Sequence, residues 1–327
     1  MADERPRLSV IMPVRDEAEH LRDAVTAVLT QEYPGELEVV LAVAPSQDGT
    51  EAIAGSLAED DRRVSVVDNP AGTAPVGLNR AIDAATGQII ARVDAHAELT
   101  PGYLTRAVEV LEQTGAANVG GIQRAVGVTP MQRAVAAAMS SRFGTGDARF
   151  HYGGEAGPID SVYLGVFRAE VLRRLGGFDE RLVRNQDYEL NIRIRAAGEV
   201  VWFDPRLEVV YRPRASLRGL ASQYWQYGRW KRATLRKHPG SLRWRQLVPP
   251  AALVANLLGV AGAAVTPWTL VVPGVYVTGV LIAAAVTAED RAALVRLPAV
   301  FATMHHAWGA GFLVGAPRGT RSRNDVG

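Results

Sequence analysis

Cysteine is absent from the 327 residues of this chain. Its absence excludes disulfides, thiolate metal sites and a cysteine nucleophile. A secretory pattern is also lacking, because residues 1–7 are polar and the apolar run that follows is short and contains Pro13. Hydrophobic residues make up 48% of the chain and charged residues 21%, which excludes a disordered or low-complexity protein. The length suggests about two domains, or one large α/β domain with an appendage.

Charge is missing from one long stretch. No Asp, Glu, Lys, Arg or His occurs between Arg245 and Glu289. A membrane-spanning helix needs about 20 apolar residues, so this stretch is long enough for two crossings, with Thr266-Pro267 at the tip of a hairpin. The apolar segment 294–315 is then expected to be an interfacial or re-entrant helix, or a third crossing. The alternative is a buried hairpin of a soluble protein, in which a core this long rarely lacks every charge.

Acidic residues are scarce just before that stretch. Residues 206–245 contain 11 Lys or Arg and the single acid Glu208. Positive charge beside a membrane segment favours the cytoplasmic side, as do Arg318, Arg321 and Arg323 in the tail. Membrane lipids are the expected partner of the basic segment, and nucleic acid is the less favoured one, because the membrane stretch adjoins it.

The first two hundred residues alternate between β-rich runs and helical patterns, which favours a mostly parallel sheet covered on both faces. Ligands bind such sheets beyond the carboxyl ends of the strands, here 13–17, 44–50 and 94–98. Gly-rich residues 144–157 are expected to form a mobile substrate loop. The expected strands are 8–13, 37–44, 64–68, 89–94, 118–123 and 162–167, and the expected helices are 50–57, 75–85, 101–113, 130–141, 187–197 and 216–238.

Asp94 and His96 stand two residues apart at the end of an expected strand. A carboxylate and an imidazole placed in this way can both reach a divalent cation held by a diphosphate. Mg²⁺ prefers oxygen ligands, whereas Mn²⁺ accepts a mixed set of oxygen and nitrogen. Without further context, the triplet Asp94-Ala95-His96 more commonly forms a capped turn with a histidine on the surface.

Several segments, in their order along the chain, resemble those of family 2 glycosyltransferases, and the Asp-Ala-His variant points to the succinoglycan-biosynthesis ExoA-like subgroup. The resemblance covers roughly residues 8–315. The segments are PVRDE (13–17), SQDGT (46–50), GLNRA (77–81), ARVDAH (91–96), VYLG (162–165), GGFDE (176–180), NQDYEL (185–190) and QYGRW (226–230).

The resemblance implies an α/β fold of the GT-A (Rossmann-like nucleotide-diphospho-sugar transferase) type, followed by C-terminal membrane helices. It divides the chain into a GT-A domain (1–215), a basic interfacial segment (216–245), two or three membrane-associated helices (246–315) and a basic tail (316–327). It implies a general base at Asp187, a metal (Mn²⁺ or Mg²⁺) at Asp94 and His96, nucleotide-sugar binding by Pro13, Val14, Arg15, Glu17, Asp48, Asn79 and Asp94, and acceptor or diphosphate binding by Tyr163, Gln226, Arg229 and Trp230.

The expected enzyme is a membrane-anchored inverting glycosyltransferase with its catalytic domain in the cytoplasm. Its donor would be a nucleotide-sugar, a UDP-sugar by resemblance, although Val43 stands where many members have a base-binding Asp. Its acceptor would be a lipid-linked saccharide or polyprenyl phosphate in envelope or extracellular polysaccharide synthesis. Two alternatives for individual residues stay open: Glu189 as the base, and Asp187 as a helix N-cap.

Two other functions are compatible with parts of this sequence pattern. A sugar-nucleotide-binding membrane protein without catalysis would bind nucleotide and transfer no sugar, but the acid at position 187 argues against it. A nicotinamide-dependent oxidoreductase is excluded, because that fold needs a Gly-rich turn after the first strand and residues 13–17 contain no glycine.

Overall fold

The computed structural model describes residues 5–146 and 148–316 and divides the chain into two compact units. The first unit consists of residues up to Arg124 and of Tyr152–Tyr211. The second consists of Ala125–His151 and of the chain from Arg212 onward. Residues 125–151, which the sequence-based division placed in the GT-A domain, therefore group with the C-terminal helices. The predicted basic tail lies outside the described residues, apart from Ala316.

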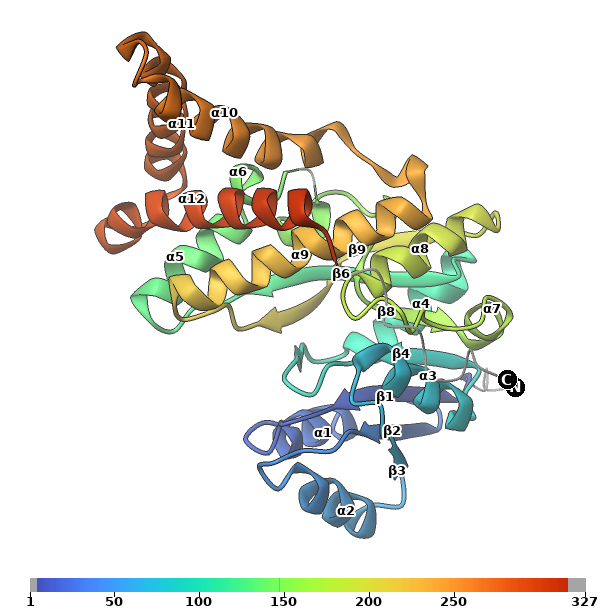
Figure 1. Cartoon of the computed structure of the whole chain (residues 1–327). Helices are drawn as coiled ribbons and strands as arrows, with labels where there is room; N and C mark the ends of the chain where they lie inside the picture. Colours follow the sequence, from blue (N-terminus) through green and yellow to red (C-terminus); the bar gives the residue numbers. More distant parts are fainter. Residues whose placement is uncertain (1–4, 147, 317–327) are drawn as a thin grey trace. The chain divides into compact units, whose positions relative to one another are not determined.

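A nine-stranded sheet forms the centre of the first unit, in the order β3-β2-β1-β4-β8-β6-β9-β5, with β7 paired to β9 (Figure 1). The N-terminal half is parallel: β1 pairs with β2 and β4, and β2 pairs with β3. Its strands are short runs rich in Val, Ile and Leu, as expected where both faces are covered. The strands are β1 (Leu8–Val14), β2 (Leu37–Val43), β3 (Val64–Asp68), β4 (Ile89–Arg92), β5 (Glu98–Leu99), β6 (Asn118–Ala125), β7 (Gly157–Pro158), β8 (Tyr163–Arg168) and β9 (Val201–Tyr211).

The expectation of a mostly parallel sheet is wrong for the other half. β8 runs antiparallel to both β4 and β6, and β9 runs antiparallel to β5 and β7. The chain leaves the sheet after β6 for the second unit and returns through β7 and β8, which reverses the strand direction. β9 was missed because Asp204, Pro205 and Arg206 interrupt its apolar alternation, as proline and charge seldom occur inside a strand.

Helices connect the strands of the first unit and bury one face each. In α1, for example, Leu21, Ala24, Val25 and Val28 are buried at helical spacing. The core formed between these helices and the sheet holds the loops at the strand ends in place. The helices are α1 (Leu21–Leu29), α2 (Thr50–Asp60), α3 (Ala74–Ala84), α4 (Tyr103–Thr114), α7 (Ala169–Arg174) and α8 (Gln186–Ala196).

The second unit is helical. Thr129 and Gln132 form a capping box at the start of α5, and the side chains of Ser216 and Asp290 cap α9 and α12. The 144–157 segment, expected as a mobile loop, contains short helical turns and β7. The elements are α5 (Pro130–Met139), α6 (Arg142–Thr145), η1 (Arg149–His151), α9 (Leu217–Lys237), η2 (Pro239–Ser241), η3 (Trp244–Leu247), α10 (Val248–Gly262), η4 (Pro267–Leu270), α11 (Val271–Thr287) and α12 (Arg291–Val314).

Helices α9 and α12 pack closely through glycines. A Cβ atom on Gly228 of α9 would lie 2.1 Å from the carbonyl oxygen of Trp308. A Cβ on Gly311 of α12 would lie 2.1 Å from the carbonyl oxygen of Trp225. The two backbones therefore approach so closely that no side chain fits between them, and α12 packs along the basic helix α9 and also against α5.

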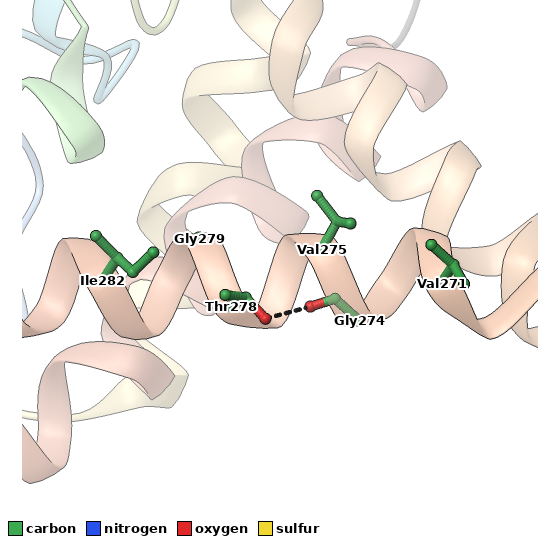
Figure 2. Close-up of a pocket in the computed structure, with 6 residues that line it drawn as sticks. All are labelled: Val271, Gly274, Val275, Thr278, Gly279 and Ile282. Atoms are coloured by element: carbon green, nitrogen blue, oxygen red, sulfur yellow. Dashed lines mark hydrogen bonds between the residues drawn. The ribbon is translucent and has the colours of Figure 1, made fainter.

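Helices α10 and α11 form an apolar hairpin, drawn in orange-brown in Figure 1. Val265 and Trp268 at its tip are 90% and 80% exposed. Among the described residues, one helical segment, Pro267–Thr287, is long and apolar enough to cross a membrane, where the sequence predicted two. One outer face of α11 forms a shallow groove along Gly274 and Gly279, where the hydroxyl of Thr278 donates to the carbonyl of Gly274 (Figure 2).

Polar side chains connect the hairpin to α12. The Tyr276 hydroxyl lies 3.2 Å from Nδ1 of His305, and Asn256 Nδ2 lies 3.2 Å from Nε2 of His306. His305 Nε2 also lies 2.8 Å from the carbonyl oxygen of Phe143, beside α6. Such contacts between otherwise apolar helices fix their register.

Gly311→Ala tests the close packing of α9 and α12. The added methyl group would collide with the backbone of Trp225, so we expect a loss of roughly 1–3 kcal/mol of stability, as in other overpacked sites. Gly279→Ala is the matched control, because a Cβ there meets nothing within 4 Å. Thermal unfolding in detergent measures both. Equal melting temperatures for the two variants would show that the helices separate without cost.

Candidate active site

The loops after β1 and β2 are joined by hydrogen bonds between side chains and backbone amides. Asp16 Oδ1 accepts from the amide of Gln47 at 3.1 Å, and Asp48 Oδ2 accepts from the amide of Ala18 at 3.0 Å. The amide of Glu17 donates to the hydroxyl of Thr50. A hydrogen bond from the Thr50 side chain, with the other contacts, lowers the pKa of Asp48. Asp48 thus orders this loop pair, and its contact with nucleotide stays a prediction.

Asp94 follows β4 and is bound by Arg92, two residues earlier. Alternate residues of an extended chain point to the same side, so both side chains face one way. Arg92 donates from Nε and Nη2 to Asp94 Oδ1 at 3.1 and 2.9 Å. Burial raises the pKa of Asp94, but Arg92 and His96 lower it more, so it stays below its usual range. Asp94 is therefore an ionised carboxylate, and its side chain remains 21% exposed.

Asp187 reaches the same guanidinium from α8. Its Oδ1 accepts from Nη1 of Arg92, and its side chain is 32% exposed. Burial raises the pKa of Asp187, and although Arg92 lowers it, the charge of Asp94 raises it again and the balance stays above the usual range. The N-cap of α8 is Asn185, whose φ is +62°, so Asp187 lies within the first turn and is not the cap.

His96 contacts Glu17, which comes from the first loop. Its Nδ1 lies 2.9 Å from Oε1 of Glu17. Histidines that bind a metal through one ring nitrogen usually donate the other to a carboxylate, so this pair fits a metal ligand. Within the described residues, no three His, Asp or Glu side chains gather closely enough to hold a metal by themselves. The binding of a cation by Asp94 and His96 therefore stays a prediction.

Asn79 and Tyr163 have clear structural contacts. The Asn79 amide accepts from the backbone N–H of Phe178 at 2.8 Å and donates to the Phe178 carbonyl and to Glu180. These bonds attach α3 to the turn before α8, which favours a structural role over the predicted contact with nucleotide. Tyr163 begins β8, close enough to Asp94 and Arg92 for both charges to affect it, and burial raises its pKa well above the usual value.

The other predicted residues are spread over the two units. Pro13 and Val14 belong to β1, where Val14 is buried, so only its backbone is available to a ligand. Arg15 is exposed and donates to the carbonyl of Gly72 at 3.2 Å. Gln226, Arg229 and Trp230 lie on α9 in the second unit.

Arg229 and its neighbour Arg232 bind the end of α12. Arg229 Nε donates to the carbonyl of Gly315 at 2.9 Å, and Arg232 donates to the carbonyls of Phe312 and Leu313. Arginine is favourable at a helix C-terminus, where carbonyl groups lack partners within the helix. The predicted binding of a diphosphate by Arg229 stays a prediction.

Sequence reasoning missed one charged residue of this region and left the role of another open. Arg92 was part of a recognised segment but had no assigned role, although its spacing from Asp94 could have indicated a shared face. Glu189, the alternative base, is fully buried and accepts from Arg193 Nε at 3.1 and 3.0 Å. Arg193 also donates to the carbonyls of Leu175 and Gly177. Glu189 therefore stabilises the turn before α8, and Asp187 is the acid at the accessible side.

Glu189→Gln separates these two roles. Breaking a buried ion pair by removing one partner costs about 3–5 kcal/mol, so we expect a marked fall in melting temperature. Turnover per folded molecule is expected to stay close to that of the wild type, because Glu189 has no exposed surface. A variant with normal stability and no turnover would instead identify Glu189 as the base.

Comparisons with known proteins show which family this chain resembles. The model of glycosyl transferase family 2 matches residues 9–176. The chain is 33% identical over 308 residues to the succinoglycan biosynthesis protein ExoA of Rhizobium meliloti (strain 1021), covering 93% of each protein. It is 23% identical over 246 residues to a Methanococcus voltae protein, the dolichyl N-acetyl-alpha-D-glucosaminyl phosphate 3-beta-D-2,3-diacetamido-2,3-dideoxy-beta-D-glucuronosyltransferase, covering 72% of this chain and 76% of the relative.

Among solved structures, the mannosyltransferase PcManGT from Pyrobaculum calidifontis, in complex with GDP-Man and Mn²⁺, aligns with a TM-score of 0.62 at 22% identity. The alignment covers 95% of this chain and 87% of PcManGT, so the similarity of fold extends over both units. The mixed sheet is that of a GT-A fold. The family match and the full-length similarity to ExoA lead to one conclusion: this chain is a glycosyltransferase of family 2, related to ExoA.

Proposed function

We propose that this enzyme moves a sugar from a nucleotide-diphosphate sugar to a lipid-linked saccharide or polyprenyl phosphate, with inversion at the anomeric carbon. The observation that carries the proposal is the pair of Asp94 and Asp187, which come from distant parts of the chain and meet on one buried arginine. One carboxylate with a lowered pKa suits a cation, and one with a raised pKa suits a proton.

In the proposed step, Asp187 accepts the proton of the acceptor hydroxyl. The acceptor oxygen forms a bond to the anomeric carbon while the bond from that carbon to the diphosphate oxygen breaks, and the nucleoside diphosphate leaves with the bonding electrons. A single general base without an enzyme nucleophile gives one displacement, which inverts the configuration. Polyprenyl phosphate as acceptor needs no base, so loss of Asp187 would then have a small effect.

Asp94 and His96 would hold Mn²⁺ or Mg²⁺. Such an ion, when bound, neutralises the charge that develops on the diphosphate. Glu17 orients the His96 ring, and Arg92 orients the Asp94 carboxylate. The donor set of one oxygen and one nitrogen suits Mn²⁺ better than Mg²⁺, which prefers oxygen ligands.

Two nucleobases, uracil and guanine, are candidates for the donor. Resemblance favours a UDP-sugar, whereas PcManGT was solved with GDP-Man. Val43 ends β2 and is buried, so this position offers no carboxylate that could bind the nucleobase of the donor. The names of the relatives support a polysaccharide or a lipid-linked acceptor, since one acts in succinoglycan biosynthesis and another on a dolichyl-linked sugar.

We further propose that the α10–α11 hairpin crosses a membrane and returns. If α11 crosses, α10 must cross as well, because α12 packs against α9 and both therefore lie on one side. The same packing argues against α12 as a third crossing. The excess of Lys and Arg in α9 favours the cytoplasm for that side.

Release of nucleoside diphosphate tests the reaction. Purified enzyme in detergent is supplied with UDP-sugars and GDP-mannose, Mn²⁺ or Mg²⁺, and a lipid extract. We expect turnover with one donor, its loss on chelation, and a fall of roughly 100-fold or more in Asp187→Asn, as for removal of a general base. Nucleotide binding without transfer to any acceptor would favour the catalytically inactive alternative. Full activity of Asp187→Asn on an alcohol acceptor would contradict the base assignment.

The absence of cysteine makes the membrane proposal directly testable, since any introduced cysteine is the sole thiol. Trp268→Cys at the hairpin tip should react with a membrane-impermeant maleimide added outside intact cells. Val128→Cys, which is also exposed, should react only after lysis. Protection of position 268 under both conditions would mean that the hairpin enters the bilayer without crossing it.

A further inference from the structure

Arg92, which is buried, differs from two less buried arginines of the first unit in what it binds. Arg168 donates to the carbonyls of Ala116 and Leu111, and Arg173 donates to the carbonyl of Ala85. These side chains tie backbone segments together, as structural arginines commonly do. Among the described residues, every hydrogen bond of the Arg92 side chain ends on Asp94 or Asp187. Its contacts are therefore those of a residue that serves the site.

The cost of burying this guanidinium also needs an explanation. The side chain is only 6% exposed, and placing a charge out of water is unfavourable unless it is paired. The two carboxylates provide that pairing, and the Phe178 ring, 5.9 Å from the guanidinium carbon, adds a cation–π contact. Phe178 is itself buried and lies in the turn fixed by Asn79, so the guanidinium is held on a rigid support.

We propose that Arg92 is a positioning residue that aligns the metal-binding carboxylate and the general base relative to each other during sugar transfer. This inference rests on the proposed function, because it assigns Arg92 to the two residues that carry that function. The planar fork of arginine fits this role, since separate N–H groups reach two acceptors in a fixed geometry. Lysine offers a compact point charge without that fork.

The proposal is also supported by which oxygen of each carboxylate Arg92 contacts. Arg92 binds Oδ1 of Asp94 and Oδ1 of Asp187. In the described part of the chain, no hydrogen bond ends on Oδ2 of either carboxylate. Each aspartate is thus fixed through one oxygen and keeps the other for a ligand: a cation at Asp94 and the acceptor proton at Asp187.

Arg92 also makes the close approach of the two acids possible. Carboxylates that share a site repel each other, and one of them usually becomes protonated. The guanidinium of Arg92 contacts both carboxylates and reduces this repulsion, so that the general base and the metal-binding carboxylate can lie close together. Without Arg92, Asp187 and Asp94 would gain rotamer freedom and separate, and the geometry for transfer would loosen.

The experiment compares Arg92→Lys and Arg92→Met with Arg168→Lys in the full-length enzyme. Arg168 is the matched control, because it is a structural arginine outside the site. Three quantities are measured for each variant: melting temperature, kcat and KM with the active donor, and the Kd of UDP and GDP by calorimetry with and without Mn²⁺. The lysine variant is decisive, because it keeps the buried positive charge and protects folding if the methionine variant fails to fold.

For Arg92→Lys we expect kcat to fall roughly 10- to 100-fold, as when reacting groups are misplaced. The Mn²⁺-dependent Kd should rise by up to about tenfold, the usual effect of losing a partner of a metal ligand. Binding of nucleotide without Mn²⁺ should stay unchanged. Arg168→Lys should lower the melting temperature and leave kcat and Kd within about threefold, since it acts on backbone carbonyls alone.

Two results would overturn the inference. One is an Arg92→Lys enzyme whose kcat and Mn²⁺-dependent Kd stay within threefold of wild type. The other is a loss of melting temperature with unchanged kcat per folded molecule, which would make Arg92 merely structural. Failure of the proposed function looks different, because the wild type would then release no nucleotide product, or Asp187→Asn would stay active. In that case the Mn²⁺-dependent Kd of Arg92→Lys still decides whether Arg92 orients Asp94.

Discussion

The first unit is arranged around a buried positive charge. Arg92 is the last residue of β4 and binds Asp94, which follows that strand, and Asp187, from a helix that begins almost a hundred residues later. Removing any one of these three charges from water would be unfavourable if it had no partner. Pairing the guanidinium with the two carboxylates offsets that cost. Much of the nearby structure serves this arrangement: the Phe178 ring lies beside the guanidinium, Asn79 fixes the turn that carries the ring, and the Glu189–Arg193 pair supports the helix that carries Asp187.

Local sequence patterns predicted the parallel half of the sheet well, because β1, β2 and β3 are short, mostly apolar runs between helical segments. They failed at β9, where Asp204-Pro205-Arg206 breaks the alternation, and at the antiparallel direction of β8. Strand direction depends on where the chain goes between strands. Here residues 125–151, which lie between β6 and β8 in the sequence, group with the second unit, and no local pattern predicts that path.

The candidate site shows the same limit. Motif order identified Asp94, His96 and Asp187 as a group, and the structure places Asp94 and Asp187 on one arginine. What each carboxylate can do depends on burial and on its partners, and these are set by residues far away in the chain. Asp187 and Glu189 are only two positions apart, yet one is accessible and the other is sealed against Arg193. Arg92 was missed because its spacing from Asp94 indicates only a shared face, whereas its contact with Asp187 depends on a helix far away in the chain.

The end of α12 bears on how sequence signatures should be interpreted. Arg229 belongs to the QYGRW segment, and its Nε donates to the carbonyl of Gly315 at the C-cap of that helix, while Arg232 donates to the carbonyls of Phe312 and Leu313. Gly228, in the same segment, is required where the two helices cross. A segment that resembles a family signature can therefore serve to end a helix and to pack it against its neighbour. A loss of activity after a substitution in this segment would then reflect a change in the packing of α9 against α12 as readily as a lost contact with substrate.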